Sequence, residues 1–185
     1  MIAELMKSSA DVRLLADDDP EVISSAFTAA GMNKNATRYR EYLADQEAKT
    51  RVCFVATAES APVGYLTVNW TPTYPPFAEG RIPEIQDLNV LPAFRRTGVA
   101  TLLLDRAEEE IACRSDVAGI GVGLHPGYNQ AQRLYVKRGY VPDGRGLTYR
   151  NQFVTEGMRV TLDDDLLLHL TKQLERIPCV RKSAL

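Results

Sequence analysis

The sequence has 185 residues, and its 22 Lys and Arg residues against 24 Asp and Glu residues give a formal net charge of −2. This balance argues against nucleic-acid binding, which favours a basic surface. The length fits one domain, residues 1–185, with a core at about residues 11–175 and a tail at residues 176–185. No apolar run is long enough to span a membrane, so we expect no membrane association.

Few residues of the chain are suited to binding a metal ion. The two histidines and the three widely spaced cysteines, Cys53, Cys113 and Cys179, form no metal-binding pattern. We therefore expect no metal. Three cysteines with no pairing pattern are typical of a reducing compartment, and a cytoplasmic location is the simplest interpretation.

Hydrophobic periodicity predicts alternating strands and helices along the chain. In chain order, these are a strand at residues 12–15, helices at 21–30 and 36–48, strands at 52–58, 63–70 and 82–91, a helix at 97–112, a strand at 117–124, a helix at 128–138 and a last strand at 166–174. The helix at 97–112 is the clearest, because apolar residues recur every fourth position from Val99 to Ile111. The helix at 128–138 ends before Gly139, a typical residue after a helix.

Two segments fit these patterns less well. Residues 71–77 contain three prolines and are predicted to form neither a helix nor a central strand. Residues 142–162 contain three glycines and exceed a hairpin turn in length, which is typical of a functional lid. The last strand has an alternative, because the three aspartates before residue 166 could instead cap a helix.

The most informative segment joins the strand at 82–91 to the helix that follows it. Arg95, Arg96, Thr97 and Gly98 form a short basic turn directly before the helix. Backbone N–H groups at a helix N-terminus can bind phosphate, and a glycine lets the phosphate approach the backbone closely. The turn lacks the Gly-Lys-Ser/Thr of the ATP P-loop and the three spaced glycines of the dinucleotide-binding motif. It therefore predicts an anion site of another kind.

This segment resembles the signature of the GNAT superfamily of acetyl-CoA-dependent N-acetyltransferases. The signature is Gln/Arg-x-x-Gly-x-Gly/Ala after a strand, and Arg95, Gly98 and Ala100 match it. A second segment at the expected distance, from Gly121 to Tyr140, resembles the next strand and helix of the family, with Ala-x-x-Leu-Tyr followed by Gly-Tyr. The two motifs in this order make the chain similar to this family.

The resemblance implies an α/β (α+β) fold in a single domain. A mixed central sheet of six to seven strands would be flanked by about four helices, and its two central parallel strands would splay apart to admit the pantetheine arm of acetyl-CoA. By the same resemblance, acetyl-CoA is the co-substrate, and the turn and the strand before it bind it. The implied cofactor-binding residues there are Leu88, Val90, Arg95, Arg96, Gly98, Val99, Ala100 and Thr101.

Tyr135 is the general acid that the resemblance implies, because many members place a tyrosine here that can protonate the leaving CoA thiolate. A tyrosine packed in the core is the alternative, and both can hold at once. Tyr128 stands where the family often has an asparagine that contacts pantetheine, with Asn129 one position later. We expect the Tyr128 ring to stack on the cofactor instead.

Glu84 is the candidate general base. It lies six residues before Val90, where histone-acetylating relatives carry a catalytic glutamate. Strand alternation places Glu84, Gln86, Leu88 and Val90 on one face, and a charged residue in an otherwise apolar strand suggests a function. Asp87 is an alternative from the opposite face, and many members use a chain of water molecules with no single base.

The motifs do not define the acetyl acceptor. Six aromatic residues occur in segments that bind the acceptor in this fold: Tyr39, Tyr42, Trp70, Tyr74, Phe77 and Tyr149. They favour a small-molecule primary amine with an apolar part, to which the acetyl group would pass directly from acetyl-CoA. The alternatives are a protein or peptide N-acetyltransferase and a non-catalytic CoA-binding regulatory module. The oligomeric state is left open, with a homodimer among the options.

Overall fold

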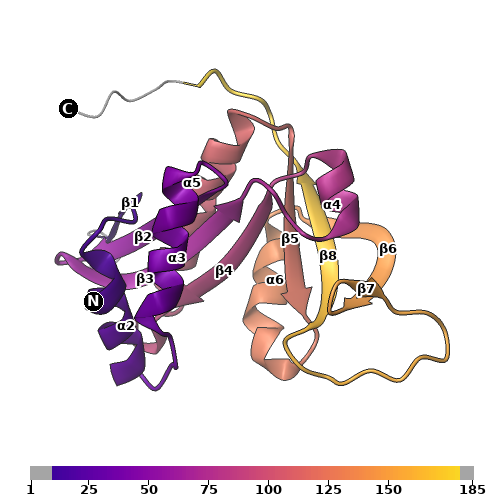
Figure 1. The fold of residues 1–185 in the computed structure, drawn as a ribbon, viewed down its shortest axis with the longest axis horizontal. Helices are drawn as coiled ribbons and strands as arrows, with labels where there is room; N and C mark the ends of the chain where they lie inside the picture. The colour runs from indigo at the N-terminus through magenta and orange to yellow at the C-terminus, as the bar shows by residue number, and fades with distance from the viewer. Residues whose placement is uncertain (1–9, 180–185) are drawn as a thin grey trace. The chain divides into compact units, whose positions relative to one another are not determined.

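The computed structural model describes residues 10–179, which Figure 1 shows in colour. The chain divides into two compact units: Met1–Trp70 with Ile85–Glu110, and Thr71–Glu84 with Ile111–Leu185. Within the described residues, no helix has both the length and the apolar character that a membrane crossing needs. The expected tail has no regular structure from residue 176 to Cys179, and its remaining residues, 180–185, lie outside the described part.

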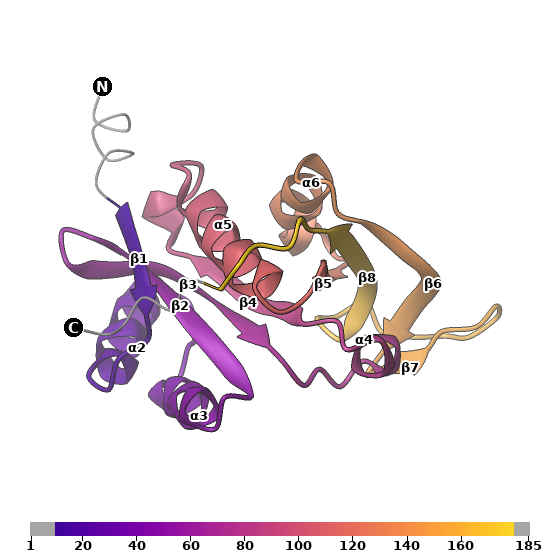
Figure 2. The same ribbon diagram turned by 90° about the horizontal axis from the view of Figure 1, so that it is seen from above.

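The first unit is a sheet with helices on both faces. Its strands are β1 (Ala10–Leu14), β2 (Arg51–Ala58), β3 (Ala61–Asn69) and most of β4 (Glu84–Val90), in that order across the sheet. Its helices are α2 (Asp19–Ala29), α3 (Ala36–Glu47), the 3-10 turn η1 (Pro92–Phe94) and most of α5 (Val99–Ala112). Figure 2 shows α2 and α3 on one side of β2 and β3, and α5 on the other.

Strand alternation explains the two faces of this sheet. Cys53 and Val55 of β2 pack with aromatic residues of α2 and α3 in one core cluster. Phe54, between them, points to the opposite face, where the Arg106 guanidinium of α5 lies 5.0 Å from its ring centre. The two strands predicted in this region form an antiparallel hairpin, β2 with β3. Glu59 and Ser60 at its tip have φ angles of 50° and 67°, the positive values that a tight hairpin turn requires.

The first helix begins at an ion pair between the buried Asp19 and the exposed Arg13. The Asp19 carboxylate accepts hydrogen bonds from the Arg13 guanidinium at 2.5 and 2.7 Å and from the Ala16 amide at 2.8 Å. Burial by itself raises the pKa of Asp19, but these hydrogen bonds outweigh it and hold the pKa below its usual range. The pair ties the start of α2 to β1.

The second unit is an antiparallel sheet with one helix on each face. Its strands run in the order β5 (Val117–Gly123), β8 (Leu166–Gln173), β6 (Val141–Tyr149) and β7 (Gln152–Phe153). Its helices are α4 (Pro75–Gly80), the 3-10 turn η2 (Pro126–Tyr128) and α6 (Asn129–Lys137). Figure 2 shows α4 and α6 on opposite sides of β8. The last predicted strand is therefore confirmed, and the alternative of a helix capped by the aspartates is wrong.

Two predictions about irregular segments need correction. Residues 71–77 were predicted to exclude a helix, yet α4 begins inside this segment. Pro75 and Pro76 occupy its first positions, where a missing N–H costs nothing because no intrahelical bond is made there. The first part of residues 142–162 is strand, because β6 and β7 occupy the segment as far as Phe153. Gly144 and Gly146, with φ angles of 80° and 83°, lie where the pairing of β6 with β8 shifts register.

The α/β class is confirmed, with eight strands instead of the six to seven expected. Five α-helices, α2 to α6, stand in the described residues against the expected four or so. The elements that the hydrophobic periodicity did not predict are α4, β6 and β7, and they come from the two segments that fit its patterns less well. The splaying of the central strands stays a prediction.

Candidate active site

The basic turn after β4 has a backbone suited to surround an anion. The chain leaves β4 at Val90, passes through η1 and turns before α5 begins at Val99. Within this turn Arg96 and Gly98 have φ angles of 63° and 97°. Left-handed residues in such a turn direct successive backbone N–H groups toward one concave side, which forms a site for negatively charged oxygens.

The amides at the start of α5 are free to bind a ligand. In the part of the chain that the structure describes, no acceptor is found for the backbone N–H groups of residues 98–101. The first backbone bond of α5 runs from Leu102 N to Gly98 O at 3.0 Å. The Thr97 hydroxyl donates to Phe94 O at 2.7 Å, and this bond stabilises the turn itself. The free amides lie at the positive end of the helix dipole, which favours an anion.

The turn is joined directly to the end of β4. Arg95 Nε donates to Val90 O at 3.2 Å, and both Arg95 and Arg96 are exposed. Leu88 and Val90 are half-buried at the end of the strand. All eight residues that the resemblance implies for the cofactor in this region therefore lie in the first unit, from β4 through the turn into α5.

A left-handed residue interrupts β4. Asp87 has a φ angle of 52°, which breaks the strict alternation that was predicted to place Glu84, Gln86, Leu88 and Val90 on one face. The two residues at the break have separate partners. Gln86 Oε1 accepts a hydrogen bond from Arg51 at 3.0 Å. The Asp87 carboxylate accepts one from the hydroxyl of Tyr42.

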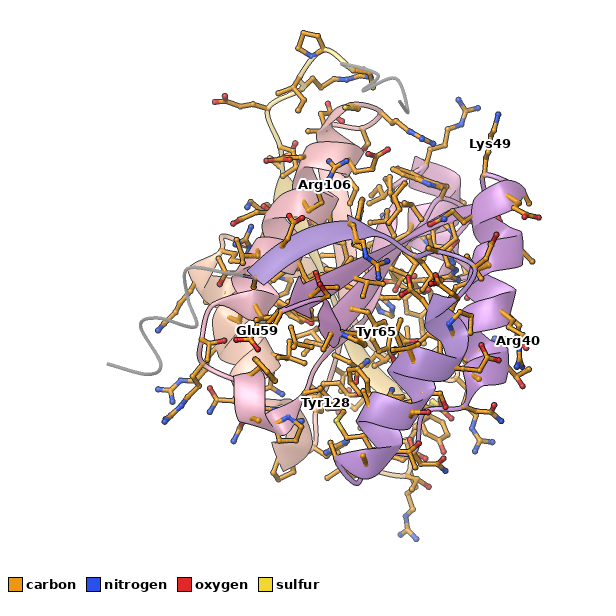
Figure 3. The ribbon with its side chains drawn as sticks, turned by 90° about the vertical axis from the view of Figure 1, so that its left-hand side faces the viewer. Arg40, Lys49, Glu59, Tyr65, Arg106 and Tyr128 are labelled. Atoms are coloured by element: carbon orange, nitrogen blue, oxygen red, sulfur yellow. The ribbon has the colours of Figure 1, made fainter. Side chains whose placement is uncertain are left out.

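Asp87 is exposed, and two buried tyrosines, Tyr42 and Tyr65, belong to its hydrogen-bond network. The backbone carbonyl of Asp87 accepts a hydrogen bond from Asn89 Nδ2 at 3.0 Å. The same Asn89 Nδ2 group donates to Tyr65 Oη at 3.2 Å. Tyr65 lies inside the side-chain layer that Figure 3 shows, whereas Arg40 of α3 points outward. Burial, followed by the charge of Asp87, raises the pKa of both Tyr42 and Tyr65, so their hydroxyls stay protonated at neutral pH.

Glu84, the candidate base, is only 5% exposed and lies in the second unit. Its Oε1 is 4.0 Å from Nε2 of His169 in β8. Across from the pair, β5 has a glycine: a Cβ at Gly121 would lie 3.6 Å from Glu84 Oε1 and 3.6 Å from His169 Cδ2. The carboxyl group is therefore buried beside the imidazole of His169 and the backbone of β5, a setting in which a carboxylate can act as a base.

Sequence reasoning missed His169. The available signal was its position, because it is one of only two histidines and interrupts the apolar run Leu166 to Leu170. A polar ring in a strand that pairs on both sides needs a partner, and the sequence does not say which residue supplies it.

Tyr135, the candidate acid, is 5% exposed and lies on α6, with its ring 6.0 Å from that of Tyr140. The interpretation as a packed core tyrosine is thus confirmed, while the acid role stays a prediction. Burial raises the pKa of Tyr135, so its hydroxyl carries a proton at neutral pH. Among the described residues, no group of three or more potential ligands could hold a metal ion.

Tyr128 packs against the end of β5. A Cβ at Gly123 would lie 2.3 Å from the Tyr128 ring, so only glycine leaves room for it. Its hydroxyl donates to Asp164 at 3.1 Å (Figure 3 labels Tyr128). His125 lies in the same turn: its Nδ1 accepts from the Gly127 amide at 3.0 Å, and its Nε2 is 2.8 Å from Asp164. These contacts give His125 a structural role in the turn.

The aromatic residues suggested for the acceptor are mostly core residues. Four of the six are at most 4% exposed: Tyr39, Tyr42, Tyr74 and Phe77. Trp70 and Tyr149 are half-buried. Most of these rings thus pack in the interior of the two units, and their role in binding the acceptor stays a prediction.

Comparison with known proteins agrees with the fold. A sequence model of the Acetyltransferase (GNAT) family matches residues 17–140. An acetyl transferase from Salmonella typhimurium that modifies the N-terminal serine of ribosomal protein L7/L12 has a TM-score of 0.67 at 8% identity, covering 90% of this chain and 96% of its own. No curated protein sequence matches.

Two other solved structures share the fold at similar levels. A spermidine/spermine N-acetyltransferase from Vibrio cholerae, in complex with manganese ions, has a TM-score of 0.62 at 16% identity and covers 91% of this chain and 94% of its own. A Salmonella typhimurium protein assigned as an acetyltransferase, solved with its cofactor acetyl-CoA, has a TM-score of 0.63 at 19% identity. The match covers 90% of this chain and 94% of that protein. The family match extends over more than half of the chain, and the chain therefore belongs to the GNAT family of acetyltransferases.

Proposed function

We propose that the chain transfers the acetyl group of acetyl-CoA directly to a primary amine of a small molecule. The observation that carries this proposal is the turn before α5, where the amides of residues 98–101 are free and two exposed arginines lie beside them. A diphosphate needs several N–H donors and positive charge in one place, and the turn supplies both. A structural neighbour that holds acetyl-CoA supports this choice of anion.

The remaining cofactor residues fit a ligand that extends from the turn along β4. The main chain of Leu88 and Val90 would pair with the pantetheine amides, because the strand has polar backbone atoms there and half-buried side chains. The Arg95 side chain, which already donates to Val90 O, would bring positive charge to the junction of the two parts. Tyr128 would also contact the cofactor.

The chemistry requires the nitrogen to lose two protons and the sulfur to gain one. An ammonium must lose a proton before its nitrogen can attack the thioester carbonyl, and Glu84 would accept that proton. The carbon–sulfur bond then breaks, and the leaving thiolate would take a proton from the Tyr135 hydroxyl. The acylated nitrogen would release its second proton to solvent, and Tyr135 would regain a proton from solvent. Tyr135 has the proton it needs at the start, because burial raises the pKa of its hydroxyl.

The acceptor is proposed to be a cationic small amine. Asp87 supports this proposal, because it presents an exposed carboxylate whose position is fixed by the Tyr42 hydroxyl and a left-handed backbone. A fixed negative charge attracts an ammonium group without the loss of side-chain freedom. The neighbour that acetylates spermidine and spermine shows that this fold can serve such amines.

The test is release of CoA thiol from acetyl-CoA with a panel of amines and of peptides with free N-termini. We expect turnover with small cationic amines, and we expect Asp87→Asn to raise the amine KM by about tenfold while leaving the acetyl-CoA KM unchanged. Turnover with peptides alone would show that the acceptor is a peptide or protein and not a small molecule. Binding of acetyl-CoA with no turnover on any amine would contradict transferase activity and favour a CoA-binding regulatory module.

A further inference from the structure

His169 lies in the interior of the second unit, in a strand that pairs on both sides. It is 1% exposed, and β8 pairs with β5 and β6. The imidazole stacks on the Tyr74 ring at 3.6 Å between ring centres and 7° between planes. The edge of the same imidazole meets Phe77 of α4, with ring centres 5.5 Å apart at 89°. Two rings thus fix the plane of His169.

The stacking partner is itself fixed. The Tyr74 hydroxyl donates to Asp143 of β6 at 2.7 Å, and Tyr74 is 1% exposed. Burial, and then the hydrogen bond to Asp143, raises the pKa of Tyr74, so this donor keeps its proton at neutral pH. The plane of the His169 ring therefore depends on a chain of contacts that ends in β6.

The two ring nitrogens of His169 face different partners. Nδ1 is 3.5 Å from the Thr148 hydroxyl, and Nε2 is 4.0 Å from Glu84 Oε1. Burial lowers the pKa of His169 to about 4, although the negative charge of Asp143 opposes this. The ring is therefore neutral at pH 7 and has one N–H and one acceptor nitrogen. If the Thr148 hydroxyl donates to Nδ1, the N–H lies on Nε2 and faces Glu84.

We propose that His169 is a positioning residue for Glu84, with its Nε2–H directed at the carboxylate and its orientation fixed by Thr148 and the Tyr74 ring. This role rests on the proposed function, because it treats Glu84 as the base. The separation of 4.0 Å is longer than a hydrogen bond, and such contacts in ligand-free sites often shorten when substrate binds. A neutral donor at this place keeps the carboxylate oriented and anionic, and it adds no positive charge that would repel an ammonium.

The kinetic test compares variants that remove the ring nitrogens of His169 or the hydroxyl of Thr148. His169→Phe keeps a flat ring against Tyr74 and removes both nitrogens. We expect kcat to fall about tenfold, the KM for acetyl-CoA to stay within about twofold, and the acidic limb of kcat/KM to move up by about one pH unit, because the carboxylate loses a donor. The charged and titratable groups facing the ring are Glu84, Asp143 and Tyr74, and this variant leaves all three in place.

Thr148 provides a matched pair of variants. Thr148→Val removes the hydroxyl at nearly constant shape and should shift the acidic limb in the same direction by a smaller amount. Thr148→Ser keeps the hydroxyl and should behave like the parent protein. An unchanged acidic limb and an unchanged kcat in His169→Phe would overturn the positioning role.

A second measurement separates this role from the proposed function. Nitrogen NMR of the imidazoles resolves only two histidines, His125 and His169, and needs no turnover. We expect His169 to be neutral with its proton on Nε2 from about pH 5.5 to pH 8. If no amine is acetylated but this form is observed, the proposed function fails while the orientation of His169 stands. A proton on Nδ1 instead would overturn the inference whatever the activity.

Discussion

The turn before α5 and the Glu84–His169 pair differ in the kind of atoms that they use. The turn offers backbone amides from consecutive residues, 98–101, with exposed arginines beside them. The pair consists of buried side chains that are supported by residues from two other segments of the second unit: Tyr74 before α4, and Thr148 and Asp143 of β6. Backbone donors suit a ligand of fixed charge such as a diphosphate, whereas buried side chains suit a group whose charge must change.

This difference decides which substitutions should matter. In the turn, a side chain can be replaced without removing an amide, so only a change in backbone conformation or an added negative charge should abolish binding. In the pair, one lost atom changes the protonation or orientation of a buried group, and buried polar groups are costly to leave without a partner. Variants of the two regions should therefore separate binding of acetyl-CoA from turnover.

The largest expected effect is at Glu84. Glu84→Gln should lower kcat by about 10²- to 10⁴-fold, because the amide cannot take up the proton of the ammonium, while calorimetry should give an unchanged affinity for acetyl-CoA. Glu59→Gln is the matched control, since Glu59 is exposed at the hairpin tip (labelled in Figure 3). A kcat for Glu84→Gln close to that of the control would show that Glu84 is not the base.

The next effect concerns stability and pH. The pKa of His169 is about 4 in the folded protein, below its value of about 6.5 in the unfolded chain, so the unfolded state binds more protons between these values. The contribution is fully present above about pH 6.5 and is lost as the pH falls toward 4, up to about 3 kcal/mol of unfolding free energy.

Urea unfolding at a series of pH values measures this contribution. His169→Phe should remove that part of the slope, and His125→Gln should retain it, because this variant leaves His169 in place. An identical slope in the parent protein and in His169→Phe would contradict the buried, neutral state of the ring.

A smaller effect is expected at Tyr135. Tyr135→Phe keeps the ring that packs beside Tyr140 and removes only the hydroxyl, so turnover should fall about tenfold with the acetyl-CoA affinity preserved. Tyr140→Phe removes a neighbouring buried hydroxyl and should leave the rate within about twofold of the parent. Equal rates for the two variants would assign Tyr135 to packing alone.

What the sequence could predict follows from how local each feature is. The anion-binding turn was predictable because Gly98 and the helix after it lie within a few residues of each other. The helix that carries Tyr135 was predictable from its apolar spacing and from Gly139, whose φ angle is 88°. These features depend on residues that are close together in the sequence, so the sequence alone is enough to predict them.

The features that were missed depend on tertiary contacts or on backbone geometry with no local marker. Helix α4 was missed because its prolines lie at the two positions where a helix tolerates them. The break at Asp87 has no glycine to mark it, and the Tyr42 hydroxyl that meets its carboxylate comes from α3. His169 meets Glu84 across 84 intervening positions, and no periodicity reports such a pairing.

The most direct measurement of the central claim is calorimetric titration with acetyl-CoA of the parent protein, Gly98→Asp and Gly98→Asn. Both side chains enter the same position, where φ is 97° and a Cβ meets nothing within 4 Å, so they share any backbone strain and differ mainly in charge. If the diphosphate lies on this turn, the parent and Gly98→Asn bind acetyl-CoA and Gly98→Asp does not. Equal affinity of the Asp and Asn variants would contradict the account.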